Sequence, residues 1–296
     1  MTTTNSPFGR ALCAMITPFT DEGALDLAGA QRLAERLVSE GCDGLVLSGT
    51  TGESPTTTDE EKARLVRAVR EAVGERASVL AGVGTFDTRH TVELALAAEK
   101  AGADGLLVVS PYYSRPPQDA LEAHFREIAD ASGLPLVVYD IPGRTGVRIE
   151  PDTMLRLAEH PRIVAVKDCS YDFMAAQKVI SRTELAYYAG CEEHNLALYA
   201  VGGAGYISTV ANAVPAQLRA VLDAFDAGET TKAARLQQRA MPLIELMMSA
   251  GLPGTVTAKA LLNELGLPAG PVRAPLRPAG REVTDGLLTA YRSLMD

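Results

Sequence analysis

The sequence lacks any apolar stretch long enough to cross a membrane. No run reaches the roughly 18 residues that a spanning helix needs. The first residues, from Met1 to Arg10, are polar and do not show the basic-then-apolar order of a secretory signal. We therefore expect a cytoplasmic protein without a membrane partner.

The chain also contains fewer positively than negatively charged residues. The 28 Lys and Arg residues are outnumbered by 37 Asp and Glu residues, which gives a net charge of −9, and no block of basic residues occurs. Nucleic-acid binding depends on a positive face that displaces counterions, so we exclude that class of protein. Any anionic ligand must be bound by single Arg side chains or backbone N–H groups, against the overall field.

Cysteine and histidine are few and widely spaced. No C-x-x-C pattern joins the four cysteines, which we expect to be reduced thiols packed in or near the core: Cys13, Cys42, Cys169 and Cys191. No i, i+4 pair occurs among the four histidines, each of which falls in a helix-like stretch: His90, His124, His160 and His194. We therefore expect no metal site.

What the chain does contain is a regular alternation of short apolar runs and amphipathic stretches. The strand candidates are residues 12–16, 44–47, 79–82, 106–109, 136–139, 163–166, 186–189 and 206–208. Helices are predicted between them, for example at 27–39, 59–73, 90–100 and 120–131. Eight such units in about 220 residues match a (β/α)8 barrel, whose parallel strands are buried on both faces.

An open doubly wound sheet is the alternative arrangement. It requires a glycine fingerprint after the first strand, and Ile16-Thr17-Pro18-Phe19-Thr20 contains none. We therefore predict an α/β protein with a (β/α)8 TIM barrel over residues 1–227. For residues 228–296 we predict a helical appendage packed on the barrel, with helices at 230–249 (interrupted at Pro242), 257–265 and 282–294.

Lys167 is the first candidate for chemistry, because it directly follows the run 163–166 at the strand end where barrel enzymes keep catalytic groups. By strand alternation its side chain shares a face with Ile163 and Ala165. If this face lines the barrel interior, the poorly solvated amine is favoured in its neutral form, which attacks ketones to give imines. A lysine that merely extends into solvent is the alternative.

Other polar groups follow neighbouring strands. The segment 49–54 (GTTGES) comes directly after the second strand, with glycines that allow close approach and Thr donors suited to a carboxylate. Tyr139 ends the fifth strand, and Arg144 lies shortly after it. Taken one at a time, segment 49–54 would be a tight turn, Tyr139 a core aromatic residue and Arg144 a solvated charge. Together with Lys167 they predict one site at the barrel mouth.

Cys169 is a second candidate nucleophile, two residues beyond Lys167. We expect it on the other side of the strand from Lys167, and no histidine base lies nearby in the sequence. We therefore assign it no catalytic role.

These motifs together resemble the pyruvate-dependent class I aldolases and lyases (the N-acetylneuraminate lyase family) and, within them, the branch of dihydrodipicolinate synthases. The resemblance covers nearly the whole chain. It rests on 49–56 (GTTGESPT), 110–113 (SPYY), 139–146 (YDIPGRTG), 166–168 (VKD) and 202–208 (GGAGYIS). Thr50-Thr51 and Arg144 favour the synthase branch over its siblings.

The resemblance implies a Schiff-base lyase that condenses pyruvate with L-aspartate 4-semialdehyde to 4-hydroxy-tetrahydrodipicolinate, in lysine and diaminopimelate biosynthesis. No metal and no organic cofactor would be needed. Lys167 would form the imine with pyruvate. Three hydroxyl groups would relay protons, those of Tyr139, Thr50 and Tyr113, the last from a neighbouring subunit.

The resemblance also implies substrate-binding roles. Thr51 would hold the pyruvate carboxylate and Arg144 the carboxylate of the semialdehyde, while Gly190 and the carbonyl of Ile207 would line the pocket. Because Tyr113 would cross an interface, we expect a homo-oligomer, either a dimer or a dimer of dimers (a homotetramer).

Two other functions are alternatives to this synthase. A sibling aldolase would cleave a 2-keto-3-deoxy sugar acid or sialic acid to pyruvate, although such relatives usually lack an arginine at the position of Arg144. A non-catalytic regulator would have no reason to keep the relay. The chain also departs from the family pattern, with Gly190-Cys191-Glu192 for Gly-Asp-Asp, Asp140 where Asn is common, and no Asn-Pro-x-Pro near 255–259.

Some relatives bind lysine as an inhibitor at their dimer interface, and here that site is only partly matched. Ser54 and Tyr112 agree with it. In place of the His, Asn and Glu of lysine-sensitive relatives stand Asp59, Lys62, Phe86 and His90. Because an ammonium needs acceptors, we predict weak or absent feedback inhibition by lysine.

Overall fold

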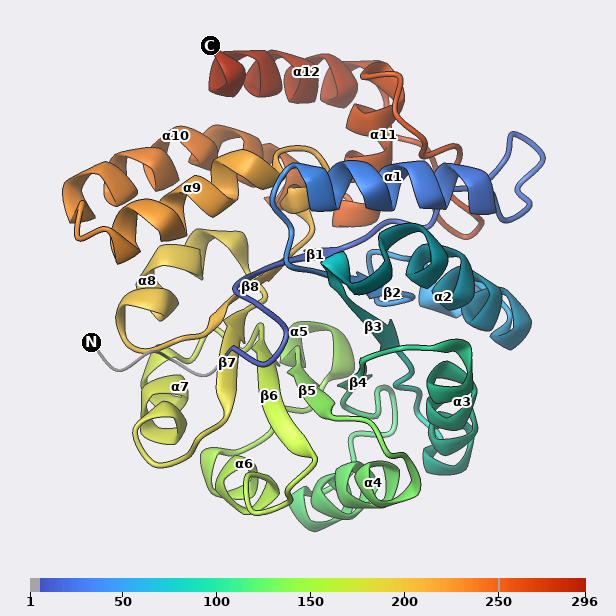
Figure 1. Ribbon diagram of the computed structural model, residues 1–296, viewed down its shortest axis with the longest axis vertical. Coiled ribbons are helices and arrows are strands. Elements are labelled where there is room, and N and C mark those ends of the chain that lie inside the picture. Colours follow the sequence, from blue (N-terminus) through green and yellow to red (C-terminus); the bar gives the residue numbers. More distant parts are fainter. Residues whose placement is uncertain (1–5, 250) are drawn as a thin grey trace.

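The computed structural model describes residues 6–249 and 251–296. Its eight parallel strands follow chain order around a closed barrel, in which β8 pairs with both β7 and β1 (Figure 1). The predicted (β/α)8 barrel is therefore confirmed. The strands are β1 (Ala11–Ala14), β2 (Gly44–Leu47), β3 (Ser78–Gly82), β4 (Gly105–Val109), β5 (Leu136–Asp140), β6 (Ile163–Asp168), β7 (Ala186–Ala189) and β8 (Gly205–Ser208).

Helices alternate with the strands and form the outer ring (Figure 1). Amphipathic faces pack them on the sheet, and caps fix their starts. For example, the Thr58 hydroxyl accepts a hydrogen bond from Glu61 N while the Glu61 carboxylate accepts one from Thr58 N. The helices are α1 (Leu27–Ser39), α2 (Asp59–Val73), α3 (Thr88–Ala101), α4 (Gln118–Ala131), α5 (Pro142–Thr145), α6 (Pro151–Leu157), α7 (Phe173–Ile180), α8 (Asn195–Ala200) and α9 (Pro215–Asp226).

At the amino ends of the strands, the barrel interior is filled by side chains. Leu12, Leu80 and Val137 belong to this inner cluster. Phe8 closes the bottom, so near Gly105 that a Cβ there would lie 2.8 Å from the Phe8 ring. The polar groups that follow the strands are consequently left at the opposite, carboxyl end of the barrel.

A β-bulge in β6 changes which of its residues face inward. Leu136 pairs with Ile163, but the next residue, Val137, pairs with Ala165, so Val164 is the extra residue. Ile163 therefore packs in the outer core under the helices, whereas Ala165 lies in the inner cluster. The expectation that Ile163 shares a face with Lys167 is wrong, because the bulge breaks the alternation. Beyond the bulge, Lys167 still follows Ala165 inward.

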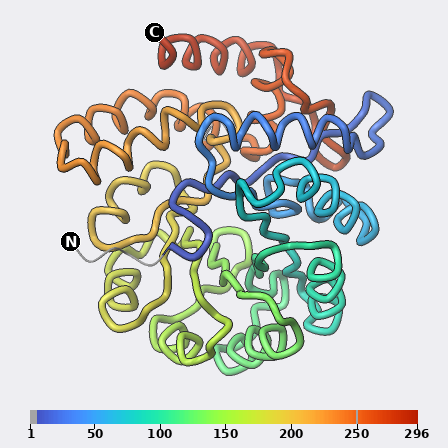
Figure 2. The backbone as a smooth tube through the Cα atoms, viewed as in Figure 1, coloured from blue at the N-terminus to red at the C-terminus, as the bar shows by residue number. Residues whose placement is uncertain are grey.

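Three helices follow the barrel: α10 (Thr230–Ser249), α11 (Gly254–Glu264) and α12 (Arg281–Met295). In Figure 2 the orange and red tubes of these helices lie along one side of the barrel, with α10 packed on α9. The predicted interruption at Pro242 is wrong, since α10 continues through it. Buried contacts of the adjacent Leu243 and Ile244 hold the helix across the missing N–H. Across the part of the chain described, no helix could span a membrane.

Candidate active site

The carboxyl ends of the strands open into a cavity of about 350 Å³. Barrel residues in its wall include Thr50, Thr51, Tyr139, Arg144, Lys167, Gly190 and Thr209, and the C-terminal segment contributes Met248, Gly254 and Thr255. A second cavity of about 230 Å³ shares Thr50, Tyr139 and Arg144 with it. The two cavities are thus adjoining compartments of one site.

Lys167 forms part of the wall of the larger compartment. Its side chain is only 5% exposed, so the alternative of a lysine extending into solvent is wrong. Lys167 pairs in register with Tyr139 on β5, and its Nζ lies 4.5 Å from the centroid of the tyrosine ring. A Cβ on Gly190 would collide with Cys169 Sγ and come within 3.0 Å of Lys167 Cε, so a larger residue here would have to displace one of these two side chains.

Tyr139 lies beside the lysine with its hydroxyl group buried. Burial raises the pKa of Tyr139 well above its usual value, while the Arg144 charge and a hydrogen bond with Thr50 act in the opposite direction. The phenol therefore keeps its proton and can donate it. The sequence predicted that Lys167, Tyr139, Thr50 and Arg144 would meet at one barrel mouth, and this is confirmed.

Thr51 is held by a buried hydrogen-bonded chain that sequence reasoning missed. Its hydroxyl lies 2.8 Å from that of Thr209, whose backbone N donates to Glu192 Oε1 at 2.6 Å. Ser208 Oγ donates to the same oxygen at 2.9 Å. Burial raises the pKa of Glu192. The only signal in the sequence was the departure at Cys191-Glu192, and nothing local linked it to Thr51.

Cys169 also faces this cavity, so its expected place on the opposite side from Lys167 is wrong. Residues two apart on a strand share a face, and Cys169 lies in the inner cluster with its Sγ 4.0 Å from the Tyr139 hydroxyl. A hydrogen bond with Cys191 and burial raise the pKa of the Cys169 thiol well above its usual value. The thiol is thus a poor nucleophile. All four cysteines are buried and unpaired, as predicted.

Of the other residues that sequence reasoning selected, Gly190 and Arg144 line the cavity, but Ile207 and Tyr113 are not among the described residues of its wall. Ile207 is fully buried in the inner cluster. Tyr113 follows β4 with a left-handed backbone (φ 74°), and its side chain is 95% exposed. Within one chain, Tyr113 therefore does not join the cavity that contains Lys167.

Of the residues compared with the lysine site of relatives, Ser54 and Tyr112 are part of the wall of the smaller compartment. His90 Nε2 lies 2.9 Å from Asp59 Oδ2. Lys62 donates from Nζ to the Thr57 carbonyl at 2.6 Å. The Phe86 ring meets Tyr112 edge-on at 5.5 Å.

The histidines are only partly placed as expected. His90 lies in α3 and His124 in α4, but His160 lies in the turn before β6, and His194 ends a short 3-10 helix (Glu192–His194). Within residues 6–249 and 251–296, no three His, Cys, Asp or Glu side chains cluster as a metal site would require.

Comparison with known proteins agrees with this geometry. The family model of the dihydrodipicolinate synthetase family matches residues 7–291. A relative named 4-hydroxy-tetrahydrodipicolinate synthase 1, from Streptomyces coelicolor, is 78% identical over 98% of this chain and 95% of its own length. A 4-hydroxy-tetrahydrodipicolinate synthase from Acidothermus cellulolyticus is 57% identical over 94% of this chain and 89% of its own.

Solved structures give the same result. The crystal structure of DHDPS from Cyanidioschyzon merolae with lysine bound superposes with a TM-score of 0.95 and 36% identity. It covers 98% of this chain, and 99% of that chain is covered. In sequence and in fold, over nearly its full length, the chain belongs to the dihydrodipicolinate synthetase family.

Proposed function

We propose that this enzyme condenses pyruvate with L-aspartate 4-semialdehyde to 4-hydroxy-tetrahydrodipicolinate through a Schiff base on Lys167. The observation that carries the proposal is the buried Lys167 amine beside the Tyr139 ring at the carboxyl end of the barrel. The names of relatives that are 78% and 57% identical support the same reaction. No metal or organic cofactor takes part in the proposed steps.

Lys167 begins the reaction. Its nitrogen attacks the ketone carbon of pyruvate, a C=N bond replaces C=O, and the oxygen leaves as water after taking two protons. Tyr139, which is protonated before the reaction begins, and the Thr50 to which it is hydrogen-bonded supply and remove protons at this carbon. The methyl group of the bound pyruvate then loses a proton, which converts the imine to an enamine.

Thr51 holds the pyruvate carboxylate in this proposal. The Thr209 hydroxyl, 2.8 Å away, fixes the Thr51 hydroxyl, and Glu192 fixes the backbone of Thr209. Gly190 lines the same cavity beside Lys167 and would form part of the pocket for the bound keto acid. The carbonyl of Ile207 stays part of the proposal, although its side chain points into the core.

Arg144 receives the second substrate in the space between the two compartments. A guanidinium forms charge-assisted hydrogen bonds with the carboxylate of the semialdehyde. The enamine carbon attacks the aldehyde carbon and forms the new C–C bond, while the aldehyde C=O opens, its oxygen takes a proton to become a hydroxyl group, and the imine to Lys167 is restored. The semialdehyde amine then adds to the imine carbon and displaces the Lys167 nitrogen, which regenerates the free lysine.

Tyr113 completes the relay from a second subunit. Its 95% exposed side chain, on a strained left-handed backbone, is consistent with a role across an interface. The proposal therefore includes a homo-oligomer, at least a dimer and in its fullest form a dimer of dimers, and a cytoplasmic location.

A condensation assay with alternative substrates tests the proposed function. The protein and pyruvate are mixed with L-aspartate 4-semialdehyde, and parallel samples receive a 2-keto-3-deoxy sugar acid or sialic acid alone. We expect turnover with the semialdehyde and none with the sugar acids. Cleavage of a sugar acid without condensation of the semialdehyde would favour the sibling aldolase instead.

A further inference from the structure

A buried carboxylate follows the loop that carries Thr50 and Thr51. Glu53 has a left-handed backbone (φ 57°), a conformation that is strained for a side chain other than glycine, and its side chain is 2% exposed. A charge placed so deeply needs partners. Both partners come from the C-terminal segment, more than two hundred residues away in the sequence.

The first partner is Lys259 of α11, itself 2% exposed. Its Nζ lies 2.6 Å from Glu53 Oε1, donates to the Pro271 carbonyl at 2.8 Å, and lies 4.1 Å from the centre of the Phe19 ring. Burial lowers the pKa of Lys259 to about 8. The ammonium form therefore still dominates at pH 7, where it can pair with the carboxylate.

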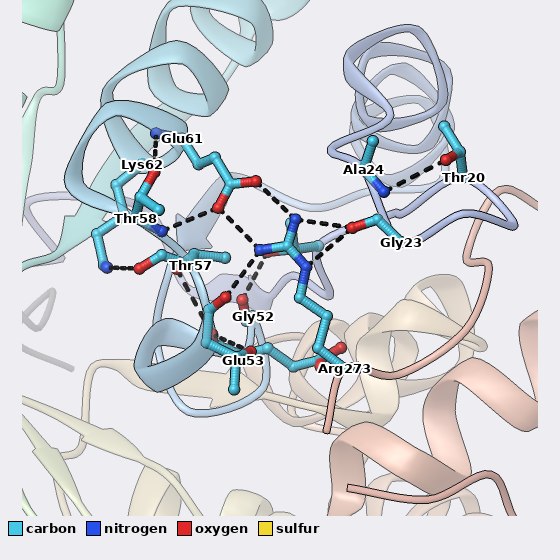
Figure 3. Close-up of polar contacts among 12 residues, drawn as sticks. Thr20, Gly23, Ala24, Gly52, Glu53, Thr57, Thr58, Glu61, Lys62 and Arg273 are labelled. Carbon is cyan, nitrogen blue, oxygen red and sulfur yellow. Dashed lines mark hydrogen bonds and ion pairs between the residues drawn. The ribbon is translucent and has the colours of Figure 1, made fainter. Parts of the chain in front are cut away.

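The second partner is Arg273, at the centre of Figure 3. Its backbone N donates to Glu53 Oε2 at 2.8 Å, and its guanidinium holds both oxygens of Glu61 on α2 at 2.6 and 2.8 Å. The same guanidinium donates to the carbonyls of Gly23 and Thr56. Its hydrogen bonds keep the pKa of Glu61 at about 2. Arg273 thus ties the loops after β1 and β2 to the C-terminal segment.

This network reaches the substrate pocket through the backbone of the loop. Glu53 N donates to the Thr50 carbonyl at 3.2 Å, and the Thr255 hydroxyl of α11 donates to the same carbonyl at 3.3 Å. The contact between the Thr51 and Thr209 hydroxyls depends on where that loop lies. A displacement of Glu53 would therefore move the two threonines that face Lys167.

We propose that Glu53, Lys259 and Arg273 form a clamp by which the C-terminal segment positions Thr50 and Thr51 for the capture of pyruvate. Glu53 and Lys259 are positioning residues, since neither is among the described residues that line the cavity containing Lys167. With Glu61, the clamp contains two carboxylates and two cations, so loss of one leaves a buried charge unpaired. The inference rests on the proposed Schiff base at Lys167.

Trapping of pyruvate by borohydride tests the clamp without the second substrate. The pyruvate concentration that gives half-maximal adduct on Lys167 is measured for the wild type, Lys259→Met and the double variant Glu53→Gln/Lys259→Met. We expect a rise of tenfold or more in both variants. The KM for the semialdehyde, at saturating pyruvate, should change less than threefold.

The double variant separates positioning from stability, because it leaves no unpaired charge at this pair and should fold even if Lys259→Met does not. Lys232→Met is the matched control. It breaks an exposed 2.6 Å ion pair between Lys232 on α10 and Glu229, which directly precedes that helix, and should leave pyruvate trapping unchanged. If the folded double variant traps pyruvate at the wild-type concentration, the clamp proposal is wrong. If the wild type forms no adduct, the proposed function fails, and the clamp proposal fails with it.

Discussion

At the scale of single residues, the proposed mechanism assigns the two substrate carboxylates to different residues around one amine. Thr51, hydrogen-bonded to Thr209, lies in the loop after β2, and Arg144 lies after β5; both line the cavity that contains Lys167 and Tyr139. The protein has a net negative charge, so the two proposed anionic substrates would depend on these local donors. Each donor can be tested separately.

Replacing Arg144 with alanine should spare the pyruvate imine but weaken use of the semialdehyde. Loss of a charge-assisted contact costs roughly 1.5–3 kcal/mol, or about ten- to a hundredfold in kcat/KM. Steady-state kinetics with the semialdehyde, together with borohydride trapping of pyruvate, checks both parts. An unchanged kcat/KM would mean that Arg144 does not bind the semialdehyde, and it would favour the alternative of an aldolase that acts on a sugar acid.

Asp140 gives a second prediction at this scale, on stability. Asp140 pairs in register with Asp168, so two carboxyl groups occupy adjacent positions on β5 and β6. Burial, together with the Asp168 charge, raises the pKa of Asp140 from 3.8 to about 7. A raised pKa in the folded state stabilises the protein fully below pH 4, and this contribution is lost as the pH rises through about 7.

Asp140→Asn removes this titration and should raise the melting temperature by several degrees at pH 8. At pH 5 the variant and the wild type should differ much less, because Asp140 then carries its proton in the folded state. Thermal unfolding followed by circular dichroism from pH 5 to pH 8.5 measures both curves. A gain that does not grow with pH would show that Asp140 is not the titrating group.

At the scale of elements, the strands and the residues that end them could be predicted from the sequence. Buried parallel strands are short continuous apolar runs. Tyr139 ends one such run, Lys167 directly follows another, and Arg144 lies shortly after Tyr139. The bulge at Val164 and the continuation of α10 through Pro242 could not be predicted from the sequence, because tertiary packing determines both. Glu192, Thr255 and Lys259 were missed for a related reason, since their partners are far away in the sequence.

The starts of α2 and α3 carry a prediction about regulation. A lysine ligand would need acceptors for its ammonium, but Asp59 is already engaged by His90 at 2.9 Å and faces Lys62 at 4.0 Å. Lys62 would add a repulsive charge, on the order of 1 kcal/mol or more where solvent is partly excluded. Phe86 offers no acceptor.

We therefore expect little or no inhibition when lysine is titrated into the millimolar range. Initial rates of condensation at fixed substrate concentrations check this. Partial inhibition at concentrations below a millimolar would contradict the charge argument.

At the scale of the whole molecule, one chain does not complete the proposed relay. Tyr113 is exposed on the loop after β4, outside the wall of the cavity that contains Lys167. Assembly would therefore be part of catalysis, and activity should depend on the presence of a second subunit.

Tyr113→Phe should lower turnover while leaving the fold and the pyruvate imine nearly unchanged, since a relay hydroxyl transfers protons rather than binding substrate. Mixing Tyr113→Phe with Lys167→Ala subunits tests its origin. A mixed dimer restores one complete site, so activity should reappear after subunit exchange. No recovery, with exchange proven by mass spectrometry, would place the hydroxyl elsewhere.

The Schiff base itself is tested most directly by mass spectrometry. The protein is incubated with pyruvate, reduced with borohydride and digested, with Lys167→Ala as the control. We expect one stable adduct, mapped to Lys167 and missing from the variant. An adduct on another lysine, or none on the folded wild-type protein, would contradict it.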